Sequence, residues 1–484
     1  MRLLKLLMAA VLTFSISGCY KIRGSSGGGQ TEFKPPRKIN SSDIALPSGY
    51  RIEPVATKLT FPTGVAFDEK GTPYVVEAGY SYGELWTTPR LLKIEPDGKT
   101  TVIAEGGKNG PWTGVVYHNG EFFIAEGGEL EGGKILKVSQ DGKITPLIEN
   151  LPSMGDHHTN GPAIGPDGMV YFSQGVATNS GVVGEDNFRF GWLKRNPEFH
   201  DIPCQDITLS GRNFETKNFI DPDSKDKVST GAFSPFGRKT SSGQTIKGKV
   251  PCSGAVMRIT TEGGGPELVA WGFRNPFGMA FTPNGQLFVT DNMYDERGSR
   301  PVFGTGDILW AVTSGTWYGW PDYHGKFPLN EHDHYAPAKG KKPELLLARH
   351  PNYPPRPVAI FPVHSSSNGL DFSRNPAFGH AGEAFVAQLG DEAPTTGKVL
   401  APVGFKVVRV NVRTGIINEF AVNKGKQNGP ASWLGTGGLE RPIAARFSPD
   451  GNALYVVDFG VLLQSKKGAE PKTETGVLWK ITRK

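Results

Sequence analysis

The stretch RNPFGMAFTPNGQLFVTDN (274–292) contains two apolar segments joined by a Pro-Asn-Gly turn. Apolar runs separated by an Asn-Gly or Asp-Gly turn are typical of β-hairpins. The same pattern recurs along the chain. The other copies are FPTGVAFDEKGTPYVVEAG (61–79), PWTGVVYHNGEFFIAEGG (111–128), HHTNGPAIGPDGMVYFSQG (157–175), SSSNGLDF…GEAFVAQLG (365–390) and RPIAARFSPDGNALYVVDFG (441–460). One hairpin repeated six times indicates a repeat architecture rather than a set of unrelated domains.

Most copies are followed by another short strand, as in RLLKIEPDG (90–98) and KILKVSQDG (134–142). Four short strands per repeat, with repeats about 50 residues long, are typical of a propeller blade. We therefore predict an all-β fold, a six-bladed β-propeller over residues 48–484. Wider spacing between the later copies predicts insertions, the largest over residues 176–253.

The two ends of this region are expected to pair. GVLWKITRK (476–484) and GYRIEPVATKL (49–59) both have the pattern of an apolar strand. Their pairing would complete one blade and close the ring, which removes the exposed edges that an open sheet leaves.

The first residues have the pattern of an export signal. Arg2 and Lys5 precede an apolar run, 6–16, that is too short to span a bilayer. The run leads into Ile-Ser-Gly-Cys (16–19), and small residues before a cysteine resemble the bacterial lipobox. The alternative is an ordinary secretory signal in which Cys19 is incidental.

We expect residues 1–18 to be a lipoprotein signal peptide, Cys19 to carry the lipid anchor, and 19–47 to form a flexible tether. The protein would then be exported and held, through this anchor alone, at the periplasmic side of the outer membrane or the cell surface. Outside the cytosol, Cys204 and Cys252 are expected to form a disulfide.

The formal net charge of +6 is spread along the chain without a dense Lys/Arg block. This pattern favours a mildly basic soluble surface over a nucleic-acid partner. The sequence contains no Cys-x-x-Cys-His motif, so we expect no c-type haem on the chain and an external electron acceptor for any redox function.

Two columns of equivalent residues emerge when the copies are aligned. The second strand of each copy ends in an acidic or amide residue: Glu77, Glu126, Gln174, Asp291, Gln388 and Asp458. We expect these side chains to satisfy backbone groups between blades.

The residues that enter the first strand differ from copy to copy. These pairs are Thr60-Phe61, Gly110-Pro111, His157-His158, Arg274-Asn275, Ser365-Ser366 and Glu440-Arg441. A histidine pair, an Arg-Asn pair and an arginine therefore converge on one mouth of the channel. Such a pocket is positively charged and contains a titratable base, which suits an anionic ligand.

Two stretches, WGFRNPFGMAFTPNGQLFVTDN (271–292) and GDILWAVTSGTWYGWPDY (306–323), closely resemble the soluble glucose/sorbosone dehydrogenase family. DHHTNGPAIGPDGMVYFSQG (156–175) resembles the histidine-bearing strand of that family, and the resemblance extends over about residues 50–484. It implies a pyrroloquinoline quinone (PQQ)-dependent enzyme with Ca²⁺. The implied reaction is oxidation of an aldose or related sugar or alcohol, with hydride transfer from substrate C1 to the quinone.

The resemblance also implies roles for individual residues. His157 matches the general base, and His158, the second histidine of the pair, is the alternative for that role and otherwise a cofactor contact. Arg274 matches the arginine beside the reactive quinone carbonyl, Asn275 a neighbouring cofactor contact, and Arg441 an arginine that binds cofactor carboxylates.

Three further positions follow from the same match. Met293 and Tyr294 fall where backbone carbonyls help to hold calcium, and Asn109 lies near a polar cofactor contact of the family. The chain departs from the family pattern in two places: APVGF (401–405) lacks a cofactor-binding lysine, and Ile443 replaces a second arginine. The acidic residues Asp295, Glu296 and Asp307 follow the calcium position with altered spacing.

Two other function classes remain open on sequence grounds. A lactonase-type propeller hydrolase would hold a divalent metal through channel carboxylates such as Glu77, Glu126, Asp291 and Asp458. A non-catalytic lipoprotein propeller would bind a glycan or a partner protein. Fold alone does not distinguish these classes.

Overall fold

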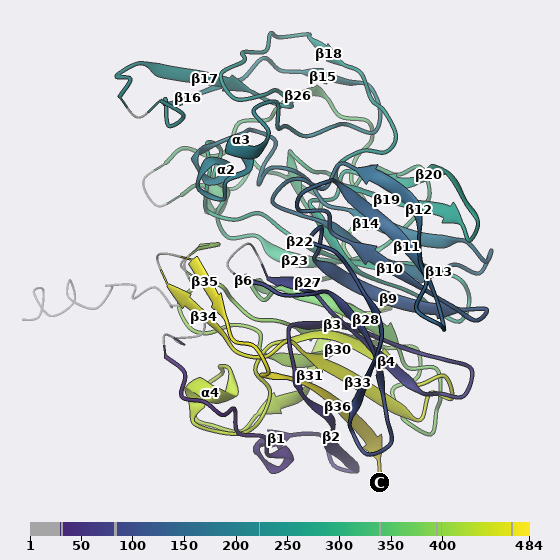
Figure 1. Cartoon of the computed structure of the whole chain (residues 1–484). Helices are drawn as coiled ribbons and strands as arrows, with labels where there is room; N and C mark the ends of the chain where they lie inside the picture. Colours follow the sequence, from purple (N-terminus) through teal and green to yellow (C-terminus); the bar gives the residue numbers. More distant parts are fainter. Residues whose placement is uncertain are drawn as a thin grey trace, which may run out of the picture.

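The computed structural model describes residues 30, 32–81, 85–221, 223–337, 340–393, 395–397, 399–465 and 468–484. Six antiparallel sheets of four main strands follow one another round a central channel in this part of the chain (Figure 1). The predicted all-β, six-bladed propeller is confirmed. The expected signal peptide and anchor residue Cys19 lie outside the described residues.

The blades use the hairpins that the sequence predicts as their first two strands, followed by two outer strands. Blade one contains β3 (Pro62–Phe67), β4 (Pro73–Glu77), β7 (Arg90–Ile94) and β8 (Thr100–Glu105). Blade two contains β9 (Trp112–His118), β10 (Glu121–Glu126), β11 (Gly133–Ser139) and β12 (Ile144–Leu151). Blade three contains β13 (Thr159–Ile164), β14 (Val170–Gln174), β19 (Ala255–Thr260) and β20 (Gly263–Trp271).

The second half of the ring repeats this order. Blade four contains β21 (Asn275–Phe281), β22 (Leu287–Asn292), β23 (Gly306–Ala311) and β27 (Ala359–Val363). Blade five contains β28 (Ser367–Phe372), β29 (Ala384–Gln388), β30 (Lys406–Asn411) and β31 (Ile416–Asn423). Blade six contains β32 (Pro442–Phe447), β33 (Ala453–Asp458), β36 (Gly476–Arg483) and β2 (Tyr50–Leu59).

Blade six joins the two ends of the propeller. Strand β2 pairs with β36 in antiparallel register, from Tyr50 opposite Arg483 to Leu59 opposite Gly476. The predicted closure of the ring by these two segments is therefore confirmed. The outermost strand of the last blade comes from the start of the domain, so unfolding of either end opens the ring.

Glycine recurs in the first strand of the blades because neighbouring inner strands approach very closely. A Cβ atom built on Gly114 would lie 2.1 Å from the carbonyl oxygen of Gly161 in the next blade. A Cβ atom on Gly278 would lie 2.4 Å from the carbonyl oxygen of Asn368. Residues from all six inner strands line a narrow channel cavity of ≈ 50 Å³. Glycine at these positions thus allows neighbouring inner strands to approach closely.

The column of polar residues at the ends of the second strands is structural, as expected. Glu77 accepts the N–H of Thr60 at 2.6 Å, and Asp291 accepts the N–H of Asn275 at 2.7 Å. Buried indole N–H groups add further bonds to this column, with Trp112 on Glu126, Trp310 on Asp291 and Trp479 on Asp458. These partners belong to the same blade as the carboxylate, whereas we expected contacts between blades. Each carboxylate therefore caps the entrance of its own first strand.

Two insertions pack together beyond blades three and four, at the top of Figure 1. The first contains α2 (Glu185–Arg189), α3 (Trp192–Arg195), β15 (Ile207–Leu209), β16 (Asn213–Lys217), β17 (Lys227–Gly231) and β18 (Thr245–Ile246). The second contains β24 (Tyr323–His324), β25 (Phe327–Pro328), a 3-10 helix (Asp333–Tyr335) and β26 (Leu347–Arg349). Strand β15 pairs with β26, which joins the insertions.

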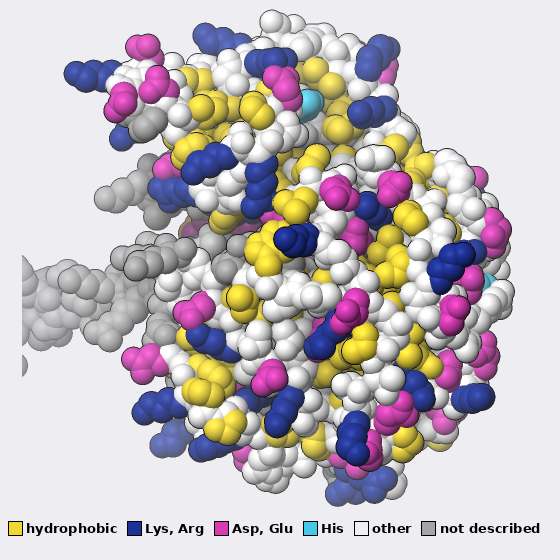
Figure 2. Space-filling view, in the orientation of Figure 1, with side chains coloured by type: hydrophobic (Ala, Val, Ile, Leu, Met, Phe, Trp, Pro, Cys, Tyr) yellow, Lys and Arg dark blue, Asp and Glu magenta, His cyan; other side chains and the backbone are white. Residues whose placement is uncertain are grey.

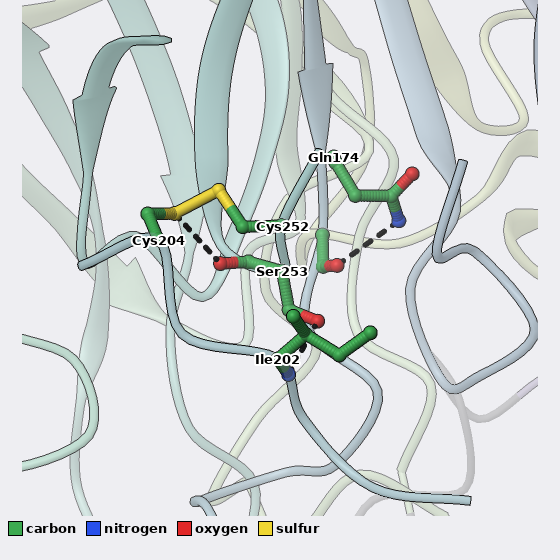
Figure 3. Close-up of a disulfide and its surroundings, with 6 residues drawn as sticks. Gln174, Ile202, Cys204, Cys252 and Ser253 are labelled. Atoms are coloured by element: carbon green, nitrogen blue, oxygen red, sulfur yellow. Dashed lines mark hydrogen bonds between the residues drawn. A yellow bond between two sulfur atoms is a disulfide. The ribbon is translucent and has the colours of Figure 1, made fainter. Parts of the chain in front are cut away.

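The predicted disulfide is present at the base of the first insertion. Cys204 and Cys252 are bonded, with their Cα atoms 5.0 Å apart (Figure 3). The two cysteines are 48 positions apart in the sequence, so the bond closes a loop that contains β15 to β18 but not α2 and α3.

The shorter elements lie on loops around the ring. They are a 3-10 helix (Ser41–Asp43), β1 (Ile44–Ala45), β5 (Tyr80–Ser81), β6 (Leu85–Trp86), α4 (Ala431–Leu434), β34 (Leu462–Ser465) and β35 (Gly468–Pro471). Helices α2 and α3 and the β34–β35 hairpin lie on the same side of the molecule, at the left of Figure 1.

The segment that precedes the propeller packs against blades five and six from Arg37 onward. Strand β1 pairs with β31, and the N–H of Asn40 donates to the carbonyl of Gly437 at 2.7 Å. The side chain of Arg37 is 3% exposed and forms an ion pair with Asp458 at 2.5 Å. The expected tether is correspondingly shorter, because a buried charge pair and a strand pairing attach its second half to blades five and six.

The outer surface carries charges of both signs. Basic and acidic side chains are interspersed on the face shown in Figure 2. Lys137, for example, lies between Glu121 and Glu262 at 3.2 and 3.4 Å. No helix in the described ranges has the length and apolar character needed to cross a membrane.

Candidate functional site

The predicted site residues lie where the first strands begin, at one mouth of the channel. His157 and His158 immediately precede β13, Arg274 and Asn275 enter β21, and Arg441 precedes β32. The alternating direction of the strands brings the loops after the second strands to this same mouth. The first insertion, which follows β14, therefore begins directly beside the histidines.

His157 is a buried histidine with a defined tautomer. Its side chain is 7% exposed, and Nδ1 lies 2.9 Å from the carbonyl oxygen of Val176. Because a carbonyl oxygen only accepts hydrogen bonds, Nδ1 carries the proton and the lone pair is on Nε2. Burial, assisted by the nearby positive charges of Arg274 and Arg297, lowers the pKa of His157 well below its usual value. The imidazole is therefore a neutral base at neutral pH.

Arg274 is fixed in one orientation by its neighbours. Its Nε and Nη2 donate to the carbonyl and the side-chain oxygen of Asn179 at 3.1 and 2.9 Å. Nη1 donates to the carbonyl of Asn292 at 3.1 Å, and Nη2 forms an ion pair with Asp295 at 2.6 Å. Arg274 is 2% exposed, so its side chain is buried and its positive charge is held in one place at the mouth.

A network of alternating charges supports Arg274. Arg297 lies between Asp156, Asp186 and Asp295, at 2.5, 2.7 and 3.0 Å. Although burial would raise the pKa of Asp295, Arg274 and Arg297 hold that pKa below its usual value. Asp295 therefore stays ionised and keeps both arginines in place. No sequence pattern pointed to Arg297, because Asp156 and Asp186 are far from it along the chain.

His364 extends the network toward blade five. Its Nδ1 and Nε2 lie 3.9 and 3.8 Å from carboxylate oxygens of Asp295 and Glu296. Burial lowers the pKa of His364, but Glu296 and Asp295 outweigh this effect and raise it overall. The mouth thus contains a third histidine that the repeat alignment did not identify, and its pKa is shifted in the opposite direction to that of His157.

A chain of asparagine side chains connects blades three, four and five at the mouth. Asn160 donates to Oδ1 of Asn275 at 3.3 Å, and Asn275 donates to Oδ1 of Asn292 at 3.3 Å. Asn160 also donates to the carbonyl of His158 at 3.2 Å. Burial lowers the pKa of His158 to about 4, so this imidazole is neutral as well. The structure therefore brings His158 and Asn275 into one hydrogen-bonded group.

Arg441 lies on the blade-six side of the mouth and is fully buried. Its Nη1 lies 3.4, 3.3 and 3.2 Å from the carbonyl oxygens of Leu389, Gly390 and Asp391. The guanidinium is also 5.0 Å from the centre of the Phe405 ring. These hydrogen bonds are at the long end of the usual range.

Glu392 connects Arg441 with the blade-four cluster. Burial raises the pKa of this glutamate, Arg441 opposes the rise, and Asp295 adds to it. The charges of Arg441 on one side of the mouth and of Asp295, the ion-pair partner of Arg274, on the other therefore both affect the pKa of Glu392.

Asn109 contacts its own blade instead. Its side-chain oxygen accepts the N–H of Leu130 at 3.1 Å and of Glu131 at 2.7 Å. Its amide donates to Glu126 at 2.8 Å and to the carbonyl of Gly132 at 3.0 Å. These four bonds fix the loop after β10, and the role of Asn109 as a cofactor contact stays a prediction.

Met293 and Tyr294 are buried at the start of the loop after β22. The N–H of Met293 donates to Asp307 at 3.2 Å, and the carbonyl of Tyr294 accepts the hydroxyl of Thr305 at 3.0 Å. Across the described ranges, no group of three or more His, Cys, Asp or Glu side chains is arranged to hold a metal ion. A cation at this position would depend on backbone carbonyls, as the resemblance implies.

Comparisons with known proteins give one match in sequence and a broad match in fold. No protein-family profile matches the chain. A segment of 183 residues is 27% identical to Quinoprotein glucose dehydrogenase B of Acinetobacter calcoaceticus and covers 38% of this chain. The match spans 30% of the length of that relative.

Solved structures resemble nearly the whole chain. The holo form of the pyranose dehydrogenase PQQ domain from Coprinopsis cinerea has a TM-score of 0.54 at 14% identity and covers 93% of this chain and 98% of that one. The calcium structure of a Trichoderma reesei carbohydrate-active enzyme of family AA12 has a TM-score of 0.53 at 14% identity, with 92% and 98% covered. At this level of identity, these structures establish that the fold is shared.

Proposed function

We propose that this chain is a member of the soluble glucose/sorbosone dehydrogenase family and a PQQ-dependent dehydrogenase of an aldose or a related sugar or alcohol. The observation that carries the proposal is the pairing of a buried neutral histidine, His157, with a buried and immobilised arginine, Arg274. The sequence match to a quinoprotein glucose dehydrogenase supports the substrate class and the cofactor.

The donors at the mouth suit an anionic quinone with several carboxylates. Arg441 is held by hydrogen bonds of 3.2 to 3.4 Å to carbonyl oxygens, and a carboxylate is a stronger acceptor than a carbonyl. Arg274 would lie beside the quinone oxygens, with the side-chain amide of Asn275 next to it. Backbone carbonyls of Met293 and Tyr294 offer the hard oxygen ligands that Ca²⁺ prefers.

The roles of His157 and Arg274 in the proposed reaction follow from their protonation states. When bound, the cofactor and its calcium would supply the hydride acceptor and the Lewis acid for the reaction. Nε2 of His157 would accept the proton of the substrate hydroxyl, since its lone pair is free of the proton that Nδ1 carries. The positive charge of Arg274 would stabilise negative charge that develops nearby in the transition state. Burial strengthens both effects, because few water molecules screen the charges.

The hydrolase alternative is less well supported. The carboxylates that would hold its metal are Glu77, Glu126, Asp291 and Asp458, and each of them accepts hydrogen bonds from the entrance of its own blade. A metal would have to displace these structural bonds. The geometry therefore favours the dehydrogenase.

The proposal is tested by reconstituting the purified protein with PQQ and Ca²⁺. We expect micromolar or tighter cofactor binding and dye reduction with at least one aldose of a panel. His157→Gln should bind the cofactor but lose most turnover, whereas the exposed control His334→Gln should keep both. Failure to bind the cofactor at micromolar concentration would contradict the proposal. Cofactor-free hydrolysis of sugar lactones would favour the hydrolase, and cofactor binding without turnover the non-catalytic alternative.

We also propose that the protein is exported and lipid-anchored through Cys19, with an external electron acceptor. The first described residue supports a short connection to the propeller: the carbonyl of Gln30 accepts the N–H of Gln464 at 3.2 Å, and its side chain lies 3.4 Å from Glu440. In cells of the source organism, we expect metabolic labelling with a fatty acid and recovery in the membrane fraction. Cys19→Ser should abolish the labelling, and retention of the label would overturn this proposal.

A further inference from the structure

Residues 175–180, which follow β14, contact both His157 and Arg274. The carbonyl of Val176 accepts from Nδ1 of His157 at 2.9 Å, and the N–H of Val176 donates to the carbonyl of Arg274 at 2.9 Å. Asn179 accepts from Nε and Nη2 of Arg274 at 3.1 and 2.9 Å. This linking segment, 175–180, therefore sets the relative position of the imidazole and the guanidinium.

One carboxylate holds the middle of the linking segment. Oδ1 of Asp201 accepts the N–H of Ala177 at 2.6 Å and of Thr178 at 3.4 Å, and Oδ2 accepts the hydroxyl of Thr178 at 2.5 Å. Asp201 has 0% exposed surface. Two residues of the segment are thus fixed by a side chain that comes from the first insertion, more than 20 positions away in the sequence.

The disulfide fixes the backbone that carries Asp201. Next to Asp201, the N–H of Ser253 donates to the carbonyl of Ile202 at 2.9 Å, and the N–H of Ile202 donates to Oγ of Ser253 at 3.1 Å. Figure 3 shows these residues beside the Cys204–Cys252 bond and close to Gln174, the last residue of β14. The insertion is therefore attached to blade three at the point where the linking segment begins.

We propose that Asp201 is a positioning residue of the active site. Its carboxylate, held in place by the disulfide, keeps the linking segment in the conformation that presents the carbonyl of Val176 to His157 and Asn179 to Arg274. Loss of this carboxylate would release the carbonyl that defines the tautomer of His157. The inference rests on the proposed function for its kinetic consequence, but not for its structural one.

The structural consequence can be measured without any cofactor. The experiment uses the full-length Cys19→Ser protein labelled with ¹⁵N-histidine. Long-range ¹H–¹⁵N spectra report the tautomer of each imidazole. The signal that is lost in His157→Gln is the signal of His157. We expect a single Nδ1-protonated form in the parent protein and in Asp201→Asn, which keeps an acceptor for Ala177. Asp201→Ala should show a mixture of tautomers, and so should the double variant Cys204→Ser with Cys252→Ser. Asp226→Ala, on an exposed loop of the same insertion, is the matched control.

The kinetic consequence is a loss of turnover more than of substrate binding. In the reconstituted enzyme, we expect Asp201→Ala to lower kcat by about 10- to 100-fold with a much smaller change in KM, because small displacements of catalytic groups cost rate. Asp201→Asn should restore most of the rate. If Asp201→Ala does not fold, Thr178→Val removes one donor to the carboxylate and should shift the His157 signal in the same direction.

Two results separate the proposals. An unchanged His157 tautomer in folded Asp201→Ala, or in Thr178→Val if the alanine variant is unfolded, would overturn the positioning role. If the variants show the expected tautomer changes but the parent protein has no dehydrogenase activity, the proposed function is refuted and the positioning role stays intact.

Discussion

The imidazole Nδ1 of His157 lies 2.9 Å from the carbonyl oxygen of Val176, and the N–H of the same Val176 lies 2.9 Å from the carbonyl oxygen of Arg274. One peptide unit on each side of Val176 thus connects the base to the cation. Because blades three and four meet at this point, a change in the packing between them would alter the distance between the two groups. The site is a property of the interface between blades rather than of either blade.

The pH dependence of the enzyme should reflect the environment of His157. Burial and the charges of Arg274 and Arg297 lower its pKa well below the usual 6.5, and the active form is the neutral one. Activity should therefore be lost only as the pH falls well below 6.5, and kcat should be flat from about pH 6.5 to 8. A kcat profile in the reconstituted enzyme measures this. An acid limb centred at or above pH 6.5 would show that His157 is not the base or is not buried in solution.

The lowered pKa of His157 should also make the stability of the protein depend on pH. An unfolded histidine binds a proton near pH 6.5, whereas folded His157 does so only at lower pH. The unfolded state therefore gains protons first, and His157 makes the protein less stable as the pH falls below about 6.5. Thermal unfolding of His157→Gln should show a weaker dependence on pH in this range than the parent protein. An identical dependence would contradict the shifted pKa.

Gly114 should tolerate no side chain. An added Cβ would lie 2.1 Å from the carbonyl oxygen of Gly161, which is backbone of the next inner strand and cannot rotate away. We expect Gly114→Ala to lower the free energy of unfolding by about 1–3 kcal/mol or more, as overpacking does. Gly107→Ala is the control, since nothing lies within 4 Å of its added Cβ. Urea unfolding compares the two, and equal stability would show that the ring can widen.

The sequence predicted those features that repeat or that depend on neighbours in the chain. The repeat of the hairpin predicted the six blades. The apolar strand pattern at the two ends of the domain predicted the pairing of β2 with β36. The alignment also brought His157 and Arg274 to one mouth. It did not predict Arg297, whose three acidic partners come from blade three, the first insertion and blade four. Such contacts depend on how the insertions fold back, and no periodicity encodes that.

The planar guanidinium of Arg441 should increase the affinity of the protein for PQQ. Its hydrogen bonds to three carbonyl oxygens and its contact with Phe405 place the planar group in one orientation. Lysine keeps the charge but cannot form two parallel bonds to a carboxylate. We expect Arg441→Lys to weaken PQQ binding by about 10- to 100-fold, as loss of one strong bidentate contact does. Arg413→Lys, on an exposed turn, should bind as the parent protein does. Equal affinity in titrations of both variants would exclude Arg441 from the cofactor site.

Arg37 should contribute to stability although it precedes the propeller. Its guanidinium forms an ion pair with Asp458 at 2.5 Å and donates to the carbonyl of Gly438 at 2.8 Å, and the side chains of Arg37 and Asp458 are 3% and 0% exposed. Removal of one partner of a buried pair leaves the other charge uncompensated, which costs about 3–5 kcal/mol. Asp458 in turn accepts the N–H of Arg441 at 2.8 Å. Arg37→Ala should therefore lower the unfolding free energy by this amount, measured by urea denaturation. Lys34→Ala, exposed on the same segment, should leave it within about 0.5 kcal/mol. If Arg37→Ala and Lys34→Ala unfold at the same urea concentration, the N-terminal segment does not stay packed on blade six in solution.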